Sequence, residues 1–298
     1  MLATFDHSQF QLQQLLPLKR EEISVCVPTR ETAATIAATV RQLVALQEVG
    51  LVDQVLVVDA GSADGTATIA AAAGAEVFQE AELLPEVGPP AGKGDAMWRA
   101  LSMLRGGIVV YLDGDVRDFG DHYVTGLLGP LLESPGTEFV KGFYRRPLAI
   151  EEMEIEDGGG RVTELAARPL LELLAPQLAQ FRQPLAGELA GRRELLARIP
   201  YLTGYGVEIA MLVDVWRQLG IERMAQVDLG SKRNSHQSLA ALAAMSREVI
   251  EALTSRLGSP DGSRTGTIEP APGVGRRLAE RPPIAALLGS RSPSTSSG

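Results

Sequence analysis

Length, composition and charge already exclude several classes of protein. The chain has 298 residues, of which 45% are hydrophobic and 22% are charged, as expected for a globular protein of one large domain or one and a half. Its formal net charge of -9 argues against a general nucleic-acid binder, which needs a cationic surface for phosphates. The single cysteine, Cys26, cannot form an internal disulfide and is typical of a reducing compartment.

Neither a signal peptide nor a membrane span is expected from the sequence. The first ten residues, MLATFDHSQF, lack a basic segment followed by an apolar core. No apolar run reaches the roughly 20 residues that a membrane-spanning helix needs. We therefore expect a cytoplasmic protein whose partners include neither a membrane nor nucleic acid.

The first 115 residues alternate between strand and helix patterns. In chain order they predict a strand over 23–28, a helix over 31–50, a strand over 55–58, a helix over 67–74, a strand over 75–80, a loop over 81–95, a helix over 95–104 and a strand over 106–115. Such alternation is typical of an α/β fold, a mainly parallel sheet with helices on both faces. Ligands of these sheets bind at the carboxyl ends of the strands.

The second half of the chain is less regular. It predicts a strand over 138–147, an acidic, glycine-rich loop leading into a helix over 154–176, a helix over 205–220, a strand with a polar loop over 225–238 and a helix over 238–257. From about residue 258 the composition shifts to Gly, Ser and Pro, and we expect residues 286–298 to form a disordered tail.

The end of the fourth predicted strand carries two carboxylates in the run VVYLDGDV. Asp113 and Asp115 directly follow apolar residues, and Asp59 ends a neighbouring strand, so the three acids are expected to converge. Clustered carboxylates repel one another unless a cation compensates, and oxygen ligands at a strand end suit Mg²⁺ or Mn²⁺ bridging to phosphates. A solvated Asp-Gly turn is the alternative interpretation of the same residues.

Two glycine-containing runs are candidate anion sites. In AGKGDA, Lys93 is placed to meet a diphosphate, although the run is not a complete phosphate loop and a solvated lysine is equally compatible. In GGGRVTEL, a guanidinium at Arg161 and the N–H groups of a helix start favour binding of a phosphate or carboxylate. A flexible linker would also explain the three glycines.

The remaining candidate residues are ambiguous on their own. Tyr205 and Glu208 begin a helix in TGYGVEI, where a glutamate is favoured by the helix dipole alone. His236 lies in a polar loop, where a histidine is either a metal ligand or merely exposed.

Taken together, the motifs VPTRE, LVVDAGSADGT, GKGDAMWRAL and VVYLDGDV resemble those of the GT-A type glycosyltransferases. The later runs VKGFYRRPL, GGGRVTELAARPLL, PLAGE, YGVEI and QVDLG are more specifically similar to the glucosyl-3-phosphoglycerate and mannosyl-3-phosphoglycerate synthases, over residues 5–285. The resemblance implies a nucleotide-sugar-binding half over 1–130 and an acceptor-binding half over 131–285 of one GT-A domain. It also implies that a hexose passes to the 2-hydroxyl of 3-phosphoglycerate with retained anomeric configuration.

The same resemblance implies a role for each candidate. The nucleotide sugar would contact Pro28, Thr29, Glu31, Asp59, Lys93, Gly114 and Tyr205. The acceptor's anionic groups would contact Gly160, Arg161 and Thr163. The catalytic set would be Asp113 near the ribose, Asp115 on the metal, Glu208 at the sugar and the backbone around Leu185 beneath the reacting face.

The resemblance leaves the metal ligands and the donor open. We expect Asp115 and His236 to bind Mg²⁺ or Mn²⁺, but an ungapped comparison puts Asn234 at the histidine's place. The donor could be GDP-mannose or a UDP-, ADP- or GDP-linked glucose, and we favour mannose with possible use of glucose. A homodimer is expected. The alternatives are another GT-A transferase, such as a polyprenyl-phosphate sugar synthase, and a non-catalytic sugar-nucleotide binder.

Overall fold

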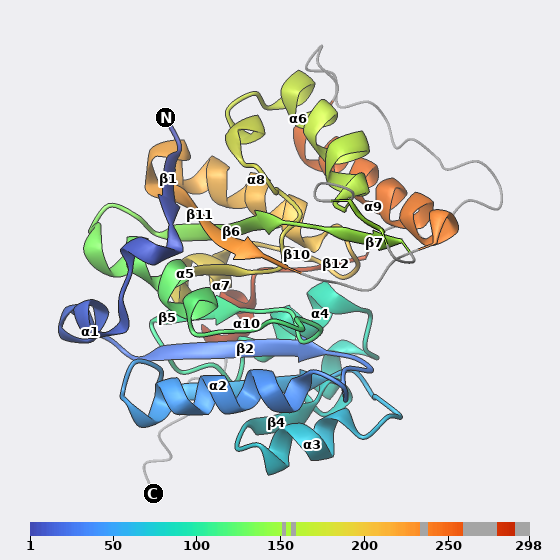
Figure 1. The fold of residues 1–298 in the computed structure, drawn as a ribbon. Helices are drawn as coiled ribbons and strands as arrows, with labels where there is room; N and C mark the ends of the chain where they lie inside the picture. The colour runs from blue at the N-terminus through green and yellow to red at the C-terminus, as the bar shows by residue number, and fades with distance from the viewer. Residues whose placement is uncertain (151–152, 156–158, 233–237, 259–278, 290–298) are drawn as a thin grey trace, which may run out of the picture.

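A computed structural model describes residues 1–150, 153–155, 159–232, 238–258 and 279–289 of the chain (Figure 1). One sheet of eight strands runs through it, in the spatial order β1-β11-β6-β9-β5-β2-β3-β4. In that order the strands are Ala3–Asp6, Met224–Ser231, Phe139–Arg145, Leu189–Arg192, Ile108–Tyr111, Ile23–Thr29, Gln54–Asp59 and Glu76–Gln79. The predicted strands and the mainly parallel α/β fold are thus confirmed.

One strand runs against the others, and this matters for the site. β9 pairs antiparallel with both β5 and β6, whereas the remaining neighbours in the sheet are parallel. Its first residue, Leu189, lies opposite Tyr111 and Lys141. The segment leading into β9 therefore lies at the same sheet edge as the carboxyl ends of β5 and β6.

Helices cover both faces of the sheet. The helices are α1 Leu12–Leu15, α2 Ile36–Glu48, α3 Thr66–Ala72, α4 Lys93–Ala100, α5 His122–Glu133, α6 Arg168–Leu174, α7 Arg193–Arg198, α8 Val207–Leu219, α9 Leu239–Leu257 and α10 Ile284–Gly289. One hydrophobic core lies between the sheet and α1, α2, α3 and α5, and the other between the sheet and α4 and α6–α10. The helix predicted over 31–50 is real but begins only at Ile36.

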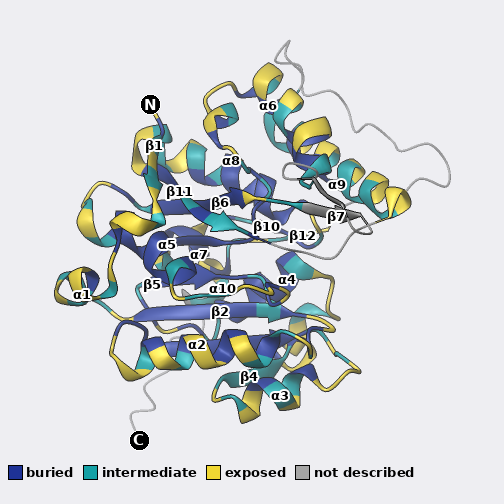
Figure 2. Cartoon of the chain, in the orientation of Figure 1, coloured by how far each residue is buried: buried dark blue, intermediate teal, exposed yellow. Residues whose placement is uncertain are grey.

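Alternate residues of the central strands enter opposite cores. On β3, Val55 and Val57 face one core while Leu56 and Val58 face the other. This explains why the strands are continuous apolar runs rather than alternating ones. Figure 2 shows the result, with buried central strands and helices that are exposed on their outer sides.

Two small antiparallel strand pairs and the C-terminal helix complete the described fold. β7 (Leu148–Ile150) pairs with β8 (Met153–Ile155), and β10 (Tyr201–Leu202) pairs with β12 (Glu280–Arg281). The predicted disordered tail begins too early, because residues 286–289 belong to α10, whose Ile284 is buried against the core. Residues 290–298 lie outside the described part of the chain.

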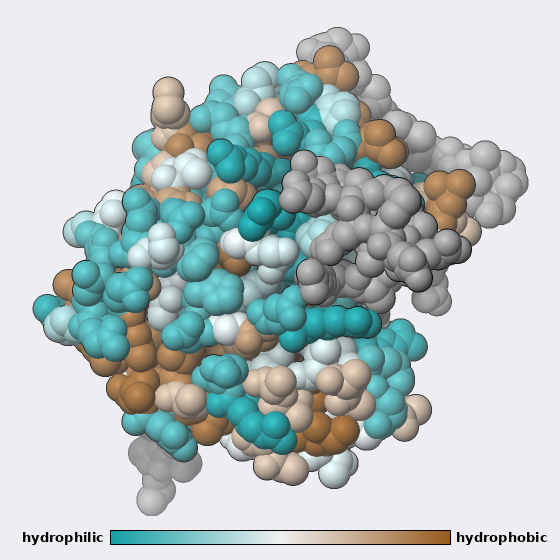
Figure 3. Space-filling view, in the orientation of Figure 1, coloured by the Kyte–Doolittle hydropathy of each residue, from teal (hydrophilic) through white to brown (hydrophobic). Residues whose placement is uncertain are grey.

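The outer surface gives no sign of a membrane-spanning segment in the described part. None of the helices described is long and apolar enough to cross a membrane. On the face seen in Figure 3, hydrophilic residues cover most of the surface and apolar residues gather mainly toward its lower left.

Candidate active site

A cavity of about 750 Å³ opens at the carboxyl ends of β2 and β5. Of the predicted site residues, twelve line it: Pro28, Thr29, Lys93, Asp113, Gly114, Asp115, Gly160, Arg161, Thr163, Leu185, Tyr205 and Glu208. Segments separated by more than a hundred residues thus meet at one place, as the strand-end argument predicts. His236 and Asn234, the alternative metal ligands, lie outside the described residues.

Two predicted nucleotide contacts do not line the cavity. Asp59 is buried, and its two carboxylate oxygens accept hydrogen bonds from the backbone N–H and the hydroxyl of Ser62. Glu31 accepts a hydrogen bond from the Ala63 N–H, and its own N–H donates to Ser62. These acids therefore shape the turn after β3, which brings Ala60 to the cavity wall instead.

A chain of ion pairs forms the floor of the cavity. Lys93 Nζ lies 2.7 Å from Glu208 Oε1 and 2.6 Å from Asp113 Oδ1. On the other side of Asp113, Lys232 Nζ lies 2.6 Å from Oδ2 and 2.6 Å from Glu188 Oε1. Burial alone would raise the pKa of Asp113, but the charges of Lys232 and Lys93 hold it well below its usual range. Asp113 is therefore a fixed carboxylate with both oxygens occupied by lysine.

Glycine is required where the β9 entry meets this floor. A Cβ atom on Gly187 would lie 2.2 Å from Asp113 Oδ1, closer than real atoms approach. The neighbouring Gly114 has Thr29 Oγ1 at 2.9 Å from its own Cβ position, and its carbonyl oxygen accepts a hydrogen bond from Thr35. The Asp-Gly-Asp turn is thus held tightly from two sides.

Sequence reasoning missed three residues of the floor: Glu188, Lys232 and Tyr144. All are buried, and the Tyr144 hydroxyl donates to Glu188 Oε2 at 2.8 Å. Burial raises the pKa of Tyr144, which keeps its hydroxyl protonated. A charged residue beside a buried apolar strand must have a partner, because burying an unpaired charge is costly. The sequence alone does not identify that partner.

The opposite wall is built by the Gly-Gly-Arg run and the helix after it. Gly160 has a φ of 71°, and a Cβ on Gly159 would lie 2.6 Å from Arg146 Cβ, so both positions need glycine. The helix that begins at Arg161 widens into a π-helical turn over Thr163–Ala167 before continuing as α6. π-helical turns are frequent at functional sites. The run is therefore an ordered wall, with Thr163 buried behind Arg161.

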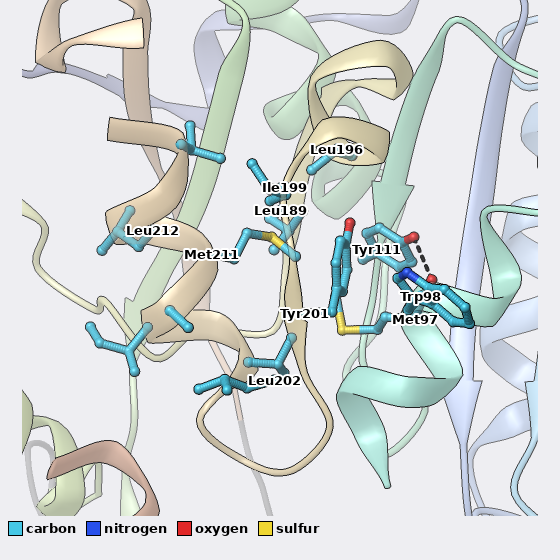
Figure 4. Close-up of a cluster of buried hydrophobic side chains, with 14 of the residues drawn as sticks. Met97, Trp98, Tyr111, Leu189, Leu196, Ile199, Tyr201, Leu202, Met211 and Leu212 are labelled. Carbon is cyan, nitrogen blue, oxygen red and sulfur yellow. Dashed lines mark hydrogen bonds between the residues drawn. The ribbon is translucent and has the colours of Figure 1, made fainter. Parts of the chain in front are cut away.

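The C-terminal segment supports the wall that carries Lys93. Arg281 Nε lies 2.7 Å from Asp95 Oδ1, and its Nη1 donates to the Val87 carbonyl oxygen. Trp98 donates its indole N–H to the Pro282 carbonyl oxygen at 2.7 Å. Figure 4 shows the packing beside Trp98, where the Tyr111 hydroxyl donates to the Met97 carbonyl oxygen. These contacts with the C-terminal segment thus hold the start of α4 in place.

The residues present fit a divalent cation that is held mainly by ligand phosphates. Asp115 is exposed on the cavity wall, whereas both oxygens of Asp113 already accept hydrogen bonds from lysine. No group of three or more His, Cys, Asp or Glu side chains suited to a metal occurs among the described residues. Mg²⁺ is commonly bound by one or two carboxylates together with substrate phosphates, which is the set that this cavity offers.

Comparison with known proteins agrees with this geometry. Residues 24–148 match the model of the family "Glycosyl transferase family 2". A glucosyl-3-phosphoglycerate synthase of Mycolicibacterium smegmatis is 45% identical over 89% of this chain and 89% of its own length. One from Petrotoga mobilis is 40% identical over 85% of this chain and 80% of its own.

Solved structures extend the match to three dimensions. The mannosyl-3-phosphoglycerate synthase of Rubrobacter xylanophilus superposes with a TM-score of 0.86 at 43% identity, over 96% of this chain and 97% of that one. The glucosyl-3-phosphoglycerate synthase of Mycobacterium tuberculosis, solved with Mn²⁺, UDP-glucose and phosphoglyceric acid, gives a TM-score of 0.84 at 40% identity, over 96% and 99%. The resemblance drawn from the sequence motifs is confirmed, and the chain belongs to the glucosyl-3-phosphoglycerate synthase family.

Proposed function

We propose that this chain transfers a hexose from a nucleotide diphosphate sugar to the 2-hydroxyl of 3-phosphoglycerate. The observation that carries the proposal is the cavity itself, in which the Lys93–Asp113 floor and the Gly160–Arg161 wall face one space. One side offers Lys93 and the exposed carboxylate of Asp115, which suit a metal-bound diphosphate, and the other offers groups suited to a small anion. Membership of the synthase family supports the same reaction.

On the donor side, Lys93 and Asp115 are the residues that we assign to the diphosphate. Asp115, together with His236, would hold Mg²⁺ or Mn²⁺, which when bound neutralises the charge of the leaving diphosphate. Lys93 keeps its proton because the carboxylates of Asp113 and Glu208 outweigh the effect of burial and raise its pKa. It therefore presents a permanent positive charge beside the diphosphate. Pro28, Thr29 and Gly114 form the adjoining wall for the nucleoside.

On the acceptor side, Arg161 and Thr163 are assigned to the phosphate and carboxylate of 3-phosphoglycerate, with the backbone of Gly160. A guanidinium group binds such oxyanions through paired hydrogen bonds, which fix orientation as well as contributing affinity. With its anionic groups held there, the acceptor is proposed to direct its 2-hydroxyl toward the floor. Holding both reactants in one geometry is itself a large part of the rate enhancement in transfer reactions.

Retention of the anomeric configuration is also part of the proposal. Glu208 is buried, and its carboxylate pairs with Lys93 at 2.7 Å, which suits contact with the sugar better than nucleophilic attack. We assign Tyr205 to the sugar and the backbone around Leu185 to the reacting face. We therefore propose that the acceptor hydroxyl attacks the sugar from the same face that the diphosphate leaves, and that the diphosphate takes the hydroxyl proton. This differs from the double displacement of retaining glycosidases, which needs a second carboxylate as nucleophile.

The names of the relatives favour glucose over mannose, the sugar that we expected from the sequence. Relatives that are 44–45% identical to this chain are named glucosyl-3-phosphoglycerate synthases, and a solved relative is described with UDP-glucose. We therefore propose UDP-glucose as the first donor to test. GDP-mannose is the second, because the mannosyl synthase structure is 43% identical to this chain. A homodimer in the cytoplasm is part of the same proposal.

One assay tests the reaction. The protein is mixed with Mg²⁺ or Mn²⁺, 3-phosphoglycerate and, in turn, UDP-glucose, GDP-mannose, ADP-glucose and GDP-glucose, and nucleoside diphosphate release is followed. Release that requires 3-phosphoglycerate is expected with at least one donor. Release that requires a polyprenyl phosphate instead, or binding of nucleotide sugar without release, would replace the proposal by one of the alternatives.

A pair of arginine variants tests the acceptor assignment. Arg161→Ala is expected to raise the KM for 3-phosphoglycerate about 10- to 100-fold, the equivalent of one lost charge-assisted hydrogen bond. Arg198→Ala is the matched control, because Arg198 is exposed on α7 and lines neither this cavity nor the pocket that adjoins Gly160 and Thr163. Equal effects of the two substitutions would contradict the assignment.

A further inference from the structure

Lys141 is a buried charge that the proposed reaction does not yet use. It lies within β6, in the apolar run FVKGFY, and its side chain is 0% exposed. Its ammonium group donates a hydrogen bond of 2.6 Å to the carbonyl oxygen of Ala186. Burying an ammonium group is costly, so a lysine in a central strand needs a specific compensation.

The bonded carbonyl belongs to the segment that enters β9 at the cavity edge. In this segment Leu185 lines the cavity, and Gly187 lies directly against the carboxylate of Asp113. The Gly142 N–H donates to the Glu188 carbonyl oxygen at 2.9 Å, so the end of the segment is tied to β6 as well. The Lys141 side chain and the Gly142 backbone therefore fix two successive points of one short loop.

Lys141 also balances the charge of the floor. The groups that act on it electrostatically are the carboxylates of Glu208, Glu188 and Asp113 and the ammonium group of Lys93. With Lys232, the floor contains three lysines and three carboxylates, and the adjoining Arg146 and Asp115 add one charge of each sign, so the formal charge is zero only while Lys141 is protonated. Burial lowers the pKa of Lys141 to about 8, close to the working range of an enzyme.

We propose that Lys141 is a positioning residue for the transfer, whose ammonium group holds the Ala186 carbonyl and thereby keeps the Leu185–Gly187 backbone at the reacting face. The inference rests on the proposed function, because it assigns a task to the loop beneath the transferred sugar. Loss of the charge weakens the hydrogen bond that holds this loop, because a neutral amine is a poorer donor than an ammonium group, and it leaves the floor with a net negative charge beside the leaving diphosphate. Both effects oppose the transfer step more than they oppose binding.

Two variants separate the charge from the hydrogen bond. Lys141→Met keeps the length of the side chain without donor or charge, and Lys141→Gln keeps a donor without the charge. We expect kcat to fall about 100-fold in Lys141→Met and less in Lys141→Gln, with the KM of both substrates changed by less than about threefold. Lys19→Met is the matched control, because Lys19 pairs with Asp53 away from the cavity. An unchanged kcat in Lys141→Met would overturn the proposal.

The pH profile gives a readout that a purely structural role would not move. In the unmodified enzyme kcat is expected to decline as the pH rises through about 8, and this decline should be absent in Lys141→Met. If neither variant folds, the pH profile of the unmodified enzyme still tests the inference. A kcat that stays constant between pH 7 and 9.5 would overturn it. A decline that persists unchanged in the variants would do the same.

Hydrogen exchange separates this inference from the proposed function. The amides of residues 185–188 are expected to exchange at least about tenfold faster in Lys141→Met than in Lys19→Met, whether or not a donor is turned over. Faster exchange in a protein that transfers no sugar would support the positioning role and reject the reaction. Unchanged exchange in an active enzyme would reject the positioning role alone.

Discussion

Replacing Glu80 by glutamine should stabilise the protein at alkaline pH and leave its stability nearly unchanged in acid. Glu80 is 1% exposed, and its Oε1 has no hydrogen-bond partner among the described residues. Burial, and then the neighbouring charge of Asp95, raise its pKa from the ordinary 4.5 to about 7. The folded state thus binds a proton more tightly than the unfolded state does.

The sign and size of the effect follow from this difference. A carboxyl group with a raised pKa contributes its stability below about pH 4.5 and loses it as the pH rises through about 7. At about 1.36 kcal/mol per pKa unit, the shift is worth about 3 kcal/mol. Glutamine resembles the protonated acid and does not titrate. The variant should therefore match the unmodified protein near pH 4.5 and exceed its free energy of unfolding by about 3 kcal/mol at pH 8.

Urea unfolding at pH 5 and pH 8 measures the difference directly. Glu82→Gln is the matched control, since Glu82 lies in the same short turn but is exposed, and it should change the free energy of unfolding by less than about 0.5 kcal/mol at either pH. A stability difference for Glu80→Gln that does not vary with pH would refute the reasoning. It would mean that Glu80 titrates normally in the folded protein.

Three further substitutions test other parts of the site. Gly187→Ala should lower kcat about 100-fold or more, because the added methyl group would displace Asp113 from the two lysines. Measuring kcat and the melting temperature of the same variant shows whether activity is lost without loss of stability. Arg281→Leu should reduce the free energy of unfolding by about 2 kcal/mol and raise the donor KM, since the buried Asp95 loses one of its two arginine partners and keeps Arg99. An unchanged donor KM would contradict the proposed support of the wall that carries Lys93. Asp115→Asn should abolish metal-dependent turnover without changing the melting temperature. Asp118 is exposed and does not line the cavity, so the control Asp118→Asn should change neither turnover nor the melting temperature.

The fold was largely predictable because its central strands are buried on both faces. Such strands appear in the sequence as apolar runs, and the runs over β2, β3 and β5 predicted real strands. β1 was missed because it is a four-residue edge strand with alternating exposure and little apolar content. The π-helical turn after Arg161 was also not predictable, since it depends on packing against α9 rather than on a local motif.

The site was predictable where one motif carries the chemistry, and not where partners are far apart. Asp113, Lys93 and Arg161 each lie in a recognisable run, and all three line the cavity. The partners Glu188 and Lys232 are 44 residues apart and meet only through the sheet order β11-β6-β9. Asp59 stays a prediction as a nucleotide contact, because an acid at a strand end serves equally well to hold its own turn, as its hydrogen bonds from Ser62 show.

The docking of the C-terminal segment has a consequence for how the protein is made. Arg281 and Pro282 brace the start of α4, although they follow it by more than 180 residues. During synthesis, all eight strands of the main sheet leave the ribosome before these residues do, because the last of the strands, β11, ends at Ser231. The wall that carries Lys93 therefore cannot be braced until the C-terminal segment has emerged, later than every strand of the main sheet.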